Sequence, residues 1–174
     1  MKKILLLILF ISMFSNAQES KSKDVFDIAR YGSVEEMKAL ESKNADTINS
    51  VNKMDFTPLI LACYKGNIEV ASYLTKRVKD VNYNSPSGTA LAASVVKGNM
   101  VLSKLLLEYK ANPNLADTSG MTPLIYAIQF KNTELVKLLL SYKAAKNLAD
   151  NSGKMPFEYA VFTKNQEIIN LLKN

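Results

Sequence analysis

The sequence predicts an all-α protein built as a solenoid of about five helix-turn-helix units. The first observation is a phrase of the type Thr-Pro-Leu, which recurs at intervals of about 33 residues and begins at positions 57, 89, 122 and 155. The second is a further apolar stretch after each phrase, separated from it by a polar break such as Gly66-Asn67. A fixed period of this size is typical of a repeat array in which each unit supplies two short helices and a connector.

Each first helix is expected to begin at the recurring threonine. Thr57 and Thr122 each precede a proline. A hydroxyl at the N-cap accepts a backbone N–H, and proline at the first helical position removes no hydrogen bond that the helix needs. Apolar and small residues then fall at helical spacing on one face, where they let neighbouring helices approach closely. These residues are Leu59, Ala62 and Cys63, then Leu91, Ser94 and Val95, then Leu124, Ala127 and Ile128.

The second helices carry the larger apolar residues. They are Val70 and Leu74, then Leu102, Leu105 and Leu106, then Leu135, Leu138 and Leu139, then Ile168, Leu171 and Leu172. A single helix pair cannot bury that much apolar surface, but stacked pairs can, so such arrays need roughly three or more copies and polar caps at both ends. The connectors between the pairs, such as residues 112–120 and 147–153, are rich in turn formers.

These phrases closely resemble the ankyrin repeat, whose pattern contains Thr-Pro-Leu-His, then Gly-His, then Val-Val and Leu-Leu. The resemblance covers almost all of the chain after residue 22. It implies an ankyrin repeat solenoid whose units are joined by β-hairpin-like finger loops, with a weaker first copy that serves as an N-terminal cap. The implied domain is 23–174, with repeats at approximately 23–51, 52–84, 85–116, 117–149 and 150–174.

The chain departs from the family pattern at three kinds of position. The histidine of Thr-Pro-Leu-His is replaced by Ile60, Ala92, Ile125 and Glu158. The glycine that the family favours after the second helix is replaced by Asn44, Val78, Lys110 and Lys143. A helix end without glycine loses a little stability wherever the left-handed conformation is kept. The third unit is one residue shorter before Thr89, so its finger is expected to be locally irregular.

The first residues predict a secretory signal peptide. Lys2 and Lys3 precede a short apolar core and small residues that end at Ala17. We expect a signal peptide over 1–17, a flexible mature N-terminus over 18–22 and a bacterial protein that is exported to the periplasm or secreted. An uncleaved anchor is the alternative, but the apolar run is shorter than the roughly 20 residues that span a bilayer. No stable membrane insertion is expected after cleavage.

Composition argues against most kinds of chemistry. The sequence has no histidine and a single cysteine, Cys63, so it lacks the commonest general base and the ligands of most zinc sites. We expect no catalytic residue, no metal and no cofactor. Cys63 is interpreted as a small buried hydrophobe, with a redox role as the alternative. The net charge of +6 is mild and comes without a nucleic-acid-binding module, so no nucleic-acid partner is expected.

The resemblance implies that contacts to a partner come from the finger tips and from the residues that end each first helix. These positions are Arg30, Tyr31, Lys53, Met54, Phe56, Tyr64, Lys65, Val96, Lys97, Met121, Gln129, Phe130, Lys154 and Phe162. Exposed aromatic residues beside cations are typical of protein-binding hot spots and suit an acidic or mixed partner surface. The alternatives are structural: lysine is favoured near a helix C-terminus by the helix dipole, and Phe162 could belong to the core.

The expected function is therefore that of a non-enzymatic, monomeric protein–protein interaction module in the bacterial envelope. It would bind its partner through the concave groove and finger loops, as a protective or inhibitory accessory. One alternative is a secreted effector that binds a host or competitor protein. The other is an enzyme, which would need a deep pocket lined by ionisable groups with displaced pKa values.

Overall fold

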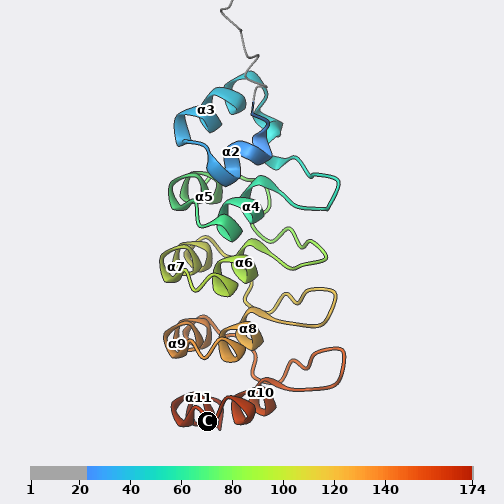
Figure 1. Ribbon diagram of the computed structural model, residues 1–174, viewed down its shortest axis with the longest axis vertical. Helices are drawn as coiled ribbons and strands as arrows, with labels where there is room; N and C mark the ends of the chain where they lie inside the picture. The colour runs from blue at the N-terminus through green and yellow to red at the C-terminus, as the bar shows by residue number, and fades with distance from the viewer. Residues whose placement is uncertain (1–22, 174) are drawn as a thin grey trace, which may run out of the picture.

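The computed structural model describes residues 23–173 as a stack of helix pairs (Figure 1). Within this range ten α-helices and one 3-10 helix follow one another. Their bounds are α2 Val25–Tyr31, α3 Val34–Lys43, η1 Ala45–Asn49, α4 Pro58–Lys65, α5 Ile68–Thr75, α6 Ala90–Val96, α7 Met100–Glu108, α8 Pro123–Gln129, α9 Thr133–Ser141, α10 Pro156–Thr163 and α11 Gln166–Lys173. The expected signal peptide and residues 18–22 lie outside the described range. In that range no helix has the length and apolar character needed to cross a membrane.

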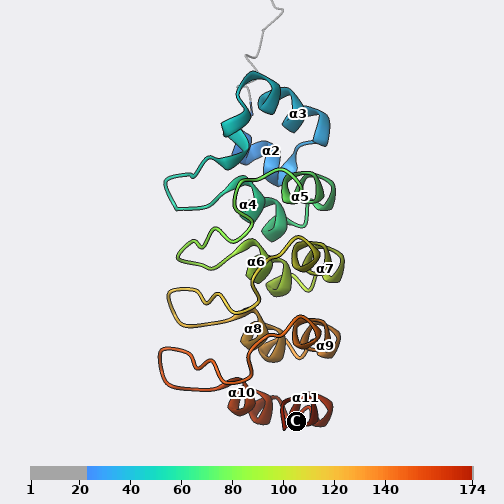
Figure 2. The same ribbon diagram turned by 180° about the vertical axis from the view of Figure 1, so that it is seen from behind.

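The helices form two ladders along the long axis of the stack. Helices α2, α4, α6, α8 and α10 contact one another in order along the first ladder, and α3, α5, α7, α9 and α11 do so along the second. Figures 1 and 2 show the finger loops projecting to one side, next to the first ladder. We call the surface between the fingers and the first ladder the inner face. The predicted all-α stack of about five units is confirmed.

The first helices begin where the sequence predicts, because the threonine hydroxyls act as caps. The Oγ1 atoms of Thr57, Thr89 and Thr122 each accept the backbone N–H three residues further on, at 3.2–3.3 Å. The last repeat has Met155 at this position, and there the Glu158 carboxylate accepts the Met155 N–H at 2.7 Å. A different side chain therefore satisfies the same helix end.

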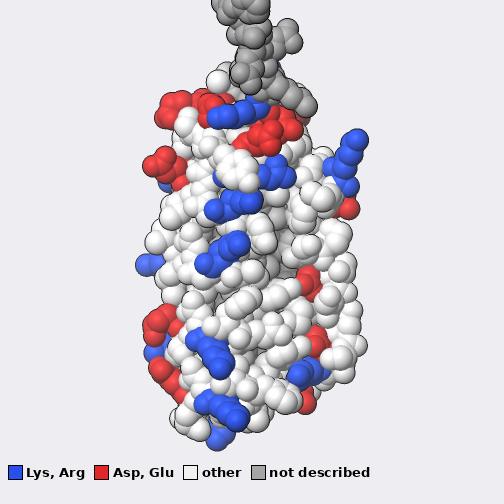
Figure 3. All heavy atoms as spheres, viewed as in Figure 1, with Lys and Arg blue, Asp and Glu red and all other residues white. Residues whose placement is uncertain are grey.

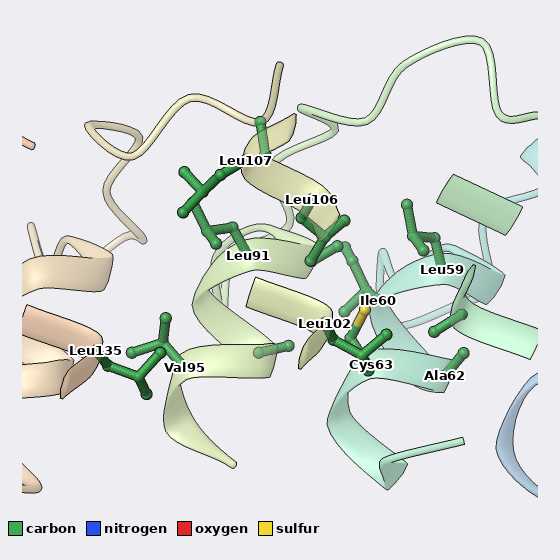
Figure 4. Packing of buried hydrophobic residues seen from close by; sticks show 14 of the residues in the cluster. Leu59, Ile60, Ala62, Cys63, Leu91, Val95, Leu102, Leu106, Leu107 and Leu135 are labelled. Carbon is green, nitrogen blue, oxygen red and sulfur yellow. The ribbon is translucent and has the colours of Figure 1, made fainter. Parts of the chain in front are cut away.

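The core runs continuously through the stack. Figure 4 shows part of it, with Cys63 from α4 and leucines from α6 and α7 in one cluster. Leu106 and Leu139 are completely buried, whereas their neighbours Leu105 and Leu138 are only partly buried. Cys63 is fully buried as well, which agrees with its interpretation as a small hydrophobe.

Asparagine side chains connect successive repeats. The Asn82 Oδ1 atom accepts the backbone N–H of Asn112 at 2.7 Å, and its Nδ2 atom donates to the Lys110 carbonyl at 3.2 Å. Asn114 makes the equivalent pair of hydrogen bonds to the following repeat. These bonds give the stack side-chain links between repeats, although the histidines of the family pattern are absent from this chain.

The fingers are tight turns more than β-hairpins. Three of them close with a backbone hydrogen bond across five residues, for example from the Asp117 N–H to the Met121 carbonyl at 3.1 Å. The finger of repeat 3 is shorter and closes across four residues between Ser85 and Gly88, which form the only isolated β-bridge within residues 23–173. The local irregularity predicted for this finger is therefore confirmed.

The helix ends differ from repeat to repeat. Lys110 and Lys143 adopt positive φ angles of 69° and 63° after the second helices, whereas Asn44 is extended with a φ of −154°. Lys131 and Lys164, which follow the first helices of repeats 4 and 5, also have positive φ angles. The left-handed conformation of the family pattern is thus kept at several positions where lysine replaces glycine, at some conformational cost.

Candidate partner-binding site

A hollow of about 480 Å³ opens on the inner face and spans helices α2, α4, α6 and α8. We call it the apolar hollow. A volume of this size lies within the range of about 300–1,000 Å³ that is typical of ligand sites. Within the described residues, its charged lining consists of Arg30 and Lys65 and includes no carboxylate. The lining contains these residues that the sequence predicts as partner-binding: Arg30, Met54, Phe56, Tyr64, Lys65 and Val96.

The apolar hollow exists because of the residue that follows each first-helix cap by four positions. This residue is Leu61 in repeat 2, Ala93 in repeat 3, Tyr126 in repeat 4 and Tyr159 in repeat 5. Leu61, Ala93 and Tyr126 all line the hollow. Because alanine occupies the position in repeat 3, no ring fills the space that a tyrosine would take there. This position is not among the residues predicted to bind a partner, although aligning the four phrases reveals the difference.

The two tyrosines at this position are held by finger carboxylates. The Tyr126 hydroxyl donates to Asp117, and the Tyr159 hydroxyl donates to Asp150. Burial, followed by the hydrogen bond to Asp117, raises the pKa of Tyr126 to about 12. The hydrogen bond to Asp150, followed by burial, raises the pKa of Tyr159 to about 12.

The pKa of Asp150, the acidic partner of Tyr159, is shifted in the opposite direction. Hydrogen bonds from Tyr159 and then from the Ser152 hydroxyl hold the pKa of Asp150 well below its usual range. The corresponding finger positions in repeats 2 and 3 are Asn52 and Ser85. Neither of these side chains has a tyrosine opposite it, because Leu61 and Ala93 occupy the helix positions.

Four aromatic residues at the ends of the first helices form a broken row on the inner face. We call Tyr31, Tyr64, Phe130 and Phe162 the aromatic row. Their exposed fractions are 67%, 47%, 57% and 72% respectively. Phe162 therefore does not belong to the core. Rings that are this exposed, with Val96 half-buried between them in repeat 3, can contact a partner without rearrangement of the stack.

Lysines lie over several of these rings. The Nζ atom of Lys65 is 5.3 Å from the centre of the Tyr31 ring, and that of Lys97 is 4.3 Å from the centre of the Tyr64 ring. In repeat 5, Lys154 lies 4.1 Å from the Phe162 ring. Each contact is worth about 0.5–1 kcal/mol at an exposed site. Lysines 65 and 97 thus connect one repeat to the ring of the repeat before it.

These lysines also leave positive charge on the inner face. No Asp or Glu carboxylate oxygen within residues 23–173 lies within 4.0 Å of the Nζ atoms of Lys65, Lys97 or Lys154. Figure 3 shows Lys and Arg side chains as a column down the middle of this view, with acidic groups gathered over the N-terminal helices and along the edges. The face is therefore suited to a partner surface that carries carboxylates.

Other residues that the sequence predicts as partner-binding differ in exposure. Lys53 and Met54 are exposed at the tip of the first finger, and Gln129 is exposed at the end of α8. The structure does not favour Met121 as a contact, because this side chain is only 9% exposed and its sulfur lies 3.7 Å from the Tyr159 hydroxyl. The finger of repeat 4 turns this residue inward against Tyr159 of the next repeat.

The cysteine thiol and the carboxylates at the start of α2 and α3, which could in principle react or bind a metal ion, have structural roles. Burial raises the pKa of the Cys63 thiol to about 12, so the reactive thiolate is disfavoured. The Asp24 carboxylate caps α2 by accepting the Asp27 N–H at 2.8 Å. Ser33 and Glu36 form a capping box at the start of α3. Within residues 23–173, no group of His, Cys, Asp and Glu side chains is placed to hold a metal ion.

Helix pairs stacked in register, with turns on one side and an exposed inner face, define a helical repeat protein. A family model described as ankyrin repeats in three copies matches residues 66–151 and, in a second match, 89–174. The chain therefore belongs to the ankyrin repeat family. Ankyrin repeats imply protein–protein interaction, and the family match concerns this domain alone.

Several curated relatives are much longer than the segment that matches this chain. The chain is similar to protein fem-1 homolog A-like of Mus musculus, with 40% identity over 44% of this chain and 12% of that protein. It is similar to ankyrin repeat and SAM domain-containing protein 6 of Rattus norvegicus, with 30% identity over 60% and 12%. The E3 ubiquitin-protein ligase Ufd4 of Drosophila melanogaster is 34% identical over 49% of this chain and 3% of its own length. The chain thus spans only a small part of these relatives.

Proposed function

We propose that the chain is a non-enzymatic module that binds a partner protein on its inner face. One observation carries the proposal: the apolar hollow, the aromatic row and uncompensated lysines share that face. Apolar and aromatic anchors supply most of the binding energy at protein interfaces, whereas complementary charge increases the association rate and the specificity. The partner surface should therefore combine apolar side chains with carboxylates.

We further propose that the chain acts in the bacterial envelope after its signal peptide is removed. The support is the pattern of residues 1–17, with its basic start, short apolar core and small residues at the cut. In the periplasm the module would protect or inhibit another envelope protein. The alternative is a secreted effector, which would use the same inner face to bind a host or competitor protein outside the producing cell.

The binding proposal is tested by capture from an envelope extract of the producing cell. Tagged wild-type protein is compared with the double variant Tyr64→Ala, Phe130→Ala, and captured proteins are identified by mass spectrometry. A protein that the wild type retains and the variant loses supports the inner face as the site. The control is Tyr109→Ala, which removes an exposed ring outside the inner face. A partner retained equally by all three proteins contradicts the proposed surface.

The proposed location has a separate test. The protein is isolated from its native cell, its N-terminal sequence is determined and each cell fraction is probed. The proposal predicts a mature chain that starts at Gln18 in the periplasmic fraction. Recovery from the culture medium alone would favour the effector, and recovery of an uncut chain in the cytoplasm would contradict export.

A further inference from the structure

We propose that the apolar hollow receives one apolar side chain from an acidic segment of the partner protein, and that Ala93 is the residue that admits it. This inference rests on the proposed protein-binding function and specifies what the site recognises. It makes the hollow the centre of the interface, and the aromatic row an extension of it.

The space for the incoming side chain comes from Ala93. The equivalent positions in repeats 4 and 5 carry Tyr126 and Tyr159, whose rings lie between the first helix and the finger and are held there by Asp117 and Asp150. At Ala93 the helix offers only a methyl group, and Ser87 of the shorter finger also lines the hollow. An apolar side chain from a partner would occupy the region that a ring of this chain fills in the later repeats.

The wall of the hollow selects apolar groups. Phe56, Ile60, Leu61 and Val96 contribute apolar side chains to its lining. The Tyr126 hydroxyl in the lining already donates to Asp117. The hydroxyls of Tyr64 and Ser87 are therefore the remaining uncharged side-chain polar groups of the lining. A polar side chain would lose water in this setting without gaining enough hydrogen bonds, whereas Leu, Met or Phe would gain from burial.

The positive charges around the hollow favour acidic residues next to the inserted side chain of the partner. Arg30 and Lys65 belong to its lining, and Lys97 lies over the neighbouring Tyr64 ring. The Arg30 guanidinium has one weak ion pair, to Asp27 at 3.5 Å, and Asp27 is itself more than half exposed. Carboxylates on the partner would find complementary charge here, and lysine or arginine at the same positions would be repelled.

A protein segment explains the face better than a small amphiphile does. A compact ligand in the hollow would leave Phe130 and Phe162, further along the inner face, fully exposed. A segment that inserts one side chain into the hollow can continue past these rings and cover them. Repeat solenoids bind partners along such extended surfaces.

The test is a selection of random peptides displayed on phage, carried out in parallel against wild-type protein and the Ala93→Tyr variant. We expect the wild type to enrich peptides in which Leu, Met or Phe is flanked by Asp or Glu. A synthetic copy of an enriched peptide should bind Ala93→Tyr at least about tenfold more weakly in a calorimetric titration. The Ala93→Tyr protein must retain the wild-type circular dichroism spectrum and melting transition.

A second variant keeps the proposal testable if Ala93→Tyr does not fold. The double reversal Arg30→Glu, Lys65→Glu changes charge at the hollow, and Lys76→Glu, Lys104→Glu makes the same net change on the second ladder. The first variant should weaken peptide binding at least about tenfold, and the second should not. Equal losses from both would indicate non-specific attraction and would overturn the inference.

Three further outcomes also overturn the inference. They are the absence of any enriched peptide, enrichment of basic peptides, and binding of decanoate at the hollow while no peptide is enriched. The last would identify a site for small amphiphiles. A natural partner that binds Ala93→Tyr as tightly as wild type would contradict this inference and leave the proposed protein-binding function intact. The protein-binding function fails separately, if no captured protein depends on the inner face.

Discussion

The inner face has two halves that differ although the same helix pair is stacked throughout. In the half built on α4 and α6, Leu61 and Ala93 face the fingers and leave the apolar hollow open. In the half built on α8 and α10, Tyr126 and Tyr159 occupy the equivalent positions and bond to finger carboxylates. The buried residues that build the stack are alike in both halves. The comparison indicates that single positions on the inner face adapt the scaffold for binding and leave the core unchanged.

The largest expected effect concerns the buried core, which the two halves share. Leu106→Ala in repeat 3 and Leu139→Ala in repeat 4 should each lower the free energy of unfolding by about 2–5 kcal/mol, because both side chains are completely buried. Urea denaturation monitored by circular dichroism measures the free energy of unfolding of both variants. The control is Leu148→Ala on an exposed connector, which should change stability by less than about 0.5 kcal/mol. A loss in only one half would show that the two cores are not equivalent.

The second prediction concerns the bond between finger and helix. Tyr126→Phe removes the hydroxyl that donates to Asp117 and should lower the free energy of unfolding by about 0.5–1.5 kcal/mol. The same change at Tyr64, whose hydroxyl forms no hydrogen bond within the described residues, should have almost no effect. Thermal denaturation compares the two variants. Equal effects would mean that the tyrosine–aspartate pair does not distinguish the halves.

The third prediction concerns pH. The pKa values of Tyr126 and Tyr159 are raised to about 12, above their unfolded value of about 10. A raised folded pKa means that the stabilisation from these pairs is complete below pH about 10 and is lost as the pH rises through about 12. In an alkaline titration followed by tyrosinate absorbance, the latest ionisation phase should lose amplitude in the Tyr126→Phe, Tyr159→Phe variant. A titration that is unchanged in its late phase would contradict the pairing.

The smallest expected effect concerns the ends of the first helices. Repeats 2 and 3 use Gly66 and Gly98 at positive φ, whereas repeats 4 and 5 use Lys131 and Lys164. Lys131→Gly and Lys164→Gly should each stabilise the protein by about 0.5–1 kcal/mol, since glycine adopts this conformation without strain. Gly66→Ala should destabilise it by about 1 kcal/mol. Chemical denaturation of the three variants measures these shifts, and a destabilising effect of both lysine replacements would refute the explanation.

The fold could be predicted from the sequence because its determinants are local and repeated. The threonine caps at Thr57, Thr89 and Thr122 and the leucines at Leu106 and Leu139 recur at fixed spacing, so each repeat supports the prediction for the next. The exposed ends of the first helices could be placed for the same reason. The residues that replace the histidine of the family pattern leave this spacing unchanged.

The apolar hollow could not be predicted in the same way, because it depends on a substitution that leaves the helical period unchanged. Ala93 and Tyr126 are both compatible with the helical pattern. Only their position opposite a finger explains why Ala93 leaves a space and the Tyr126 ring bonds to Asp117. The burial of Met121 could not be predicted either, because its side chain contacts Tyr159 of the following repeat. Contacts between repeats do not appear in the pattern of a single repeat.

The most direct test of this account is a calorimetric titration of the captured partner against Ala93→Tyr and Tyr159→Ala. The first variant adds a ring to the open half, and the second removes a ring from the filled half. The account predicts that Ala93→Tyr weakens binding at least about tenfold, while Tyr159→Ala retains affinity close to that of the wild type. Wild-type affinity in Ala93→Tyr, together with a loss in Tyr159→Ala, would contradict the claim that the open half of the inner face is the binding site.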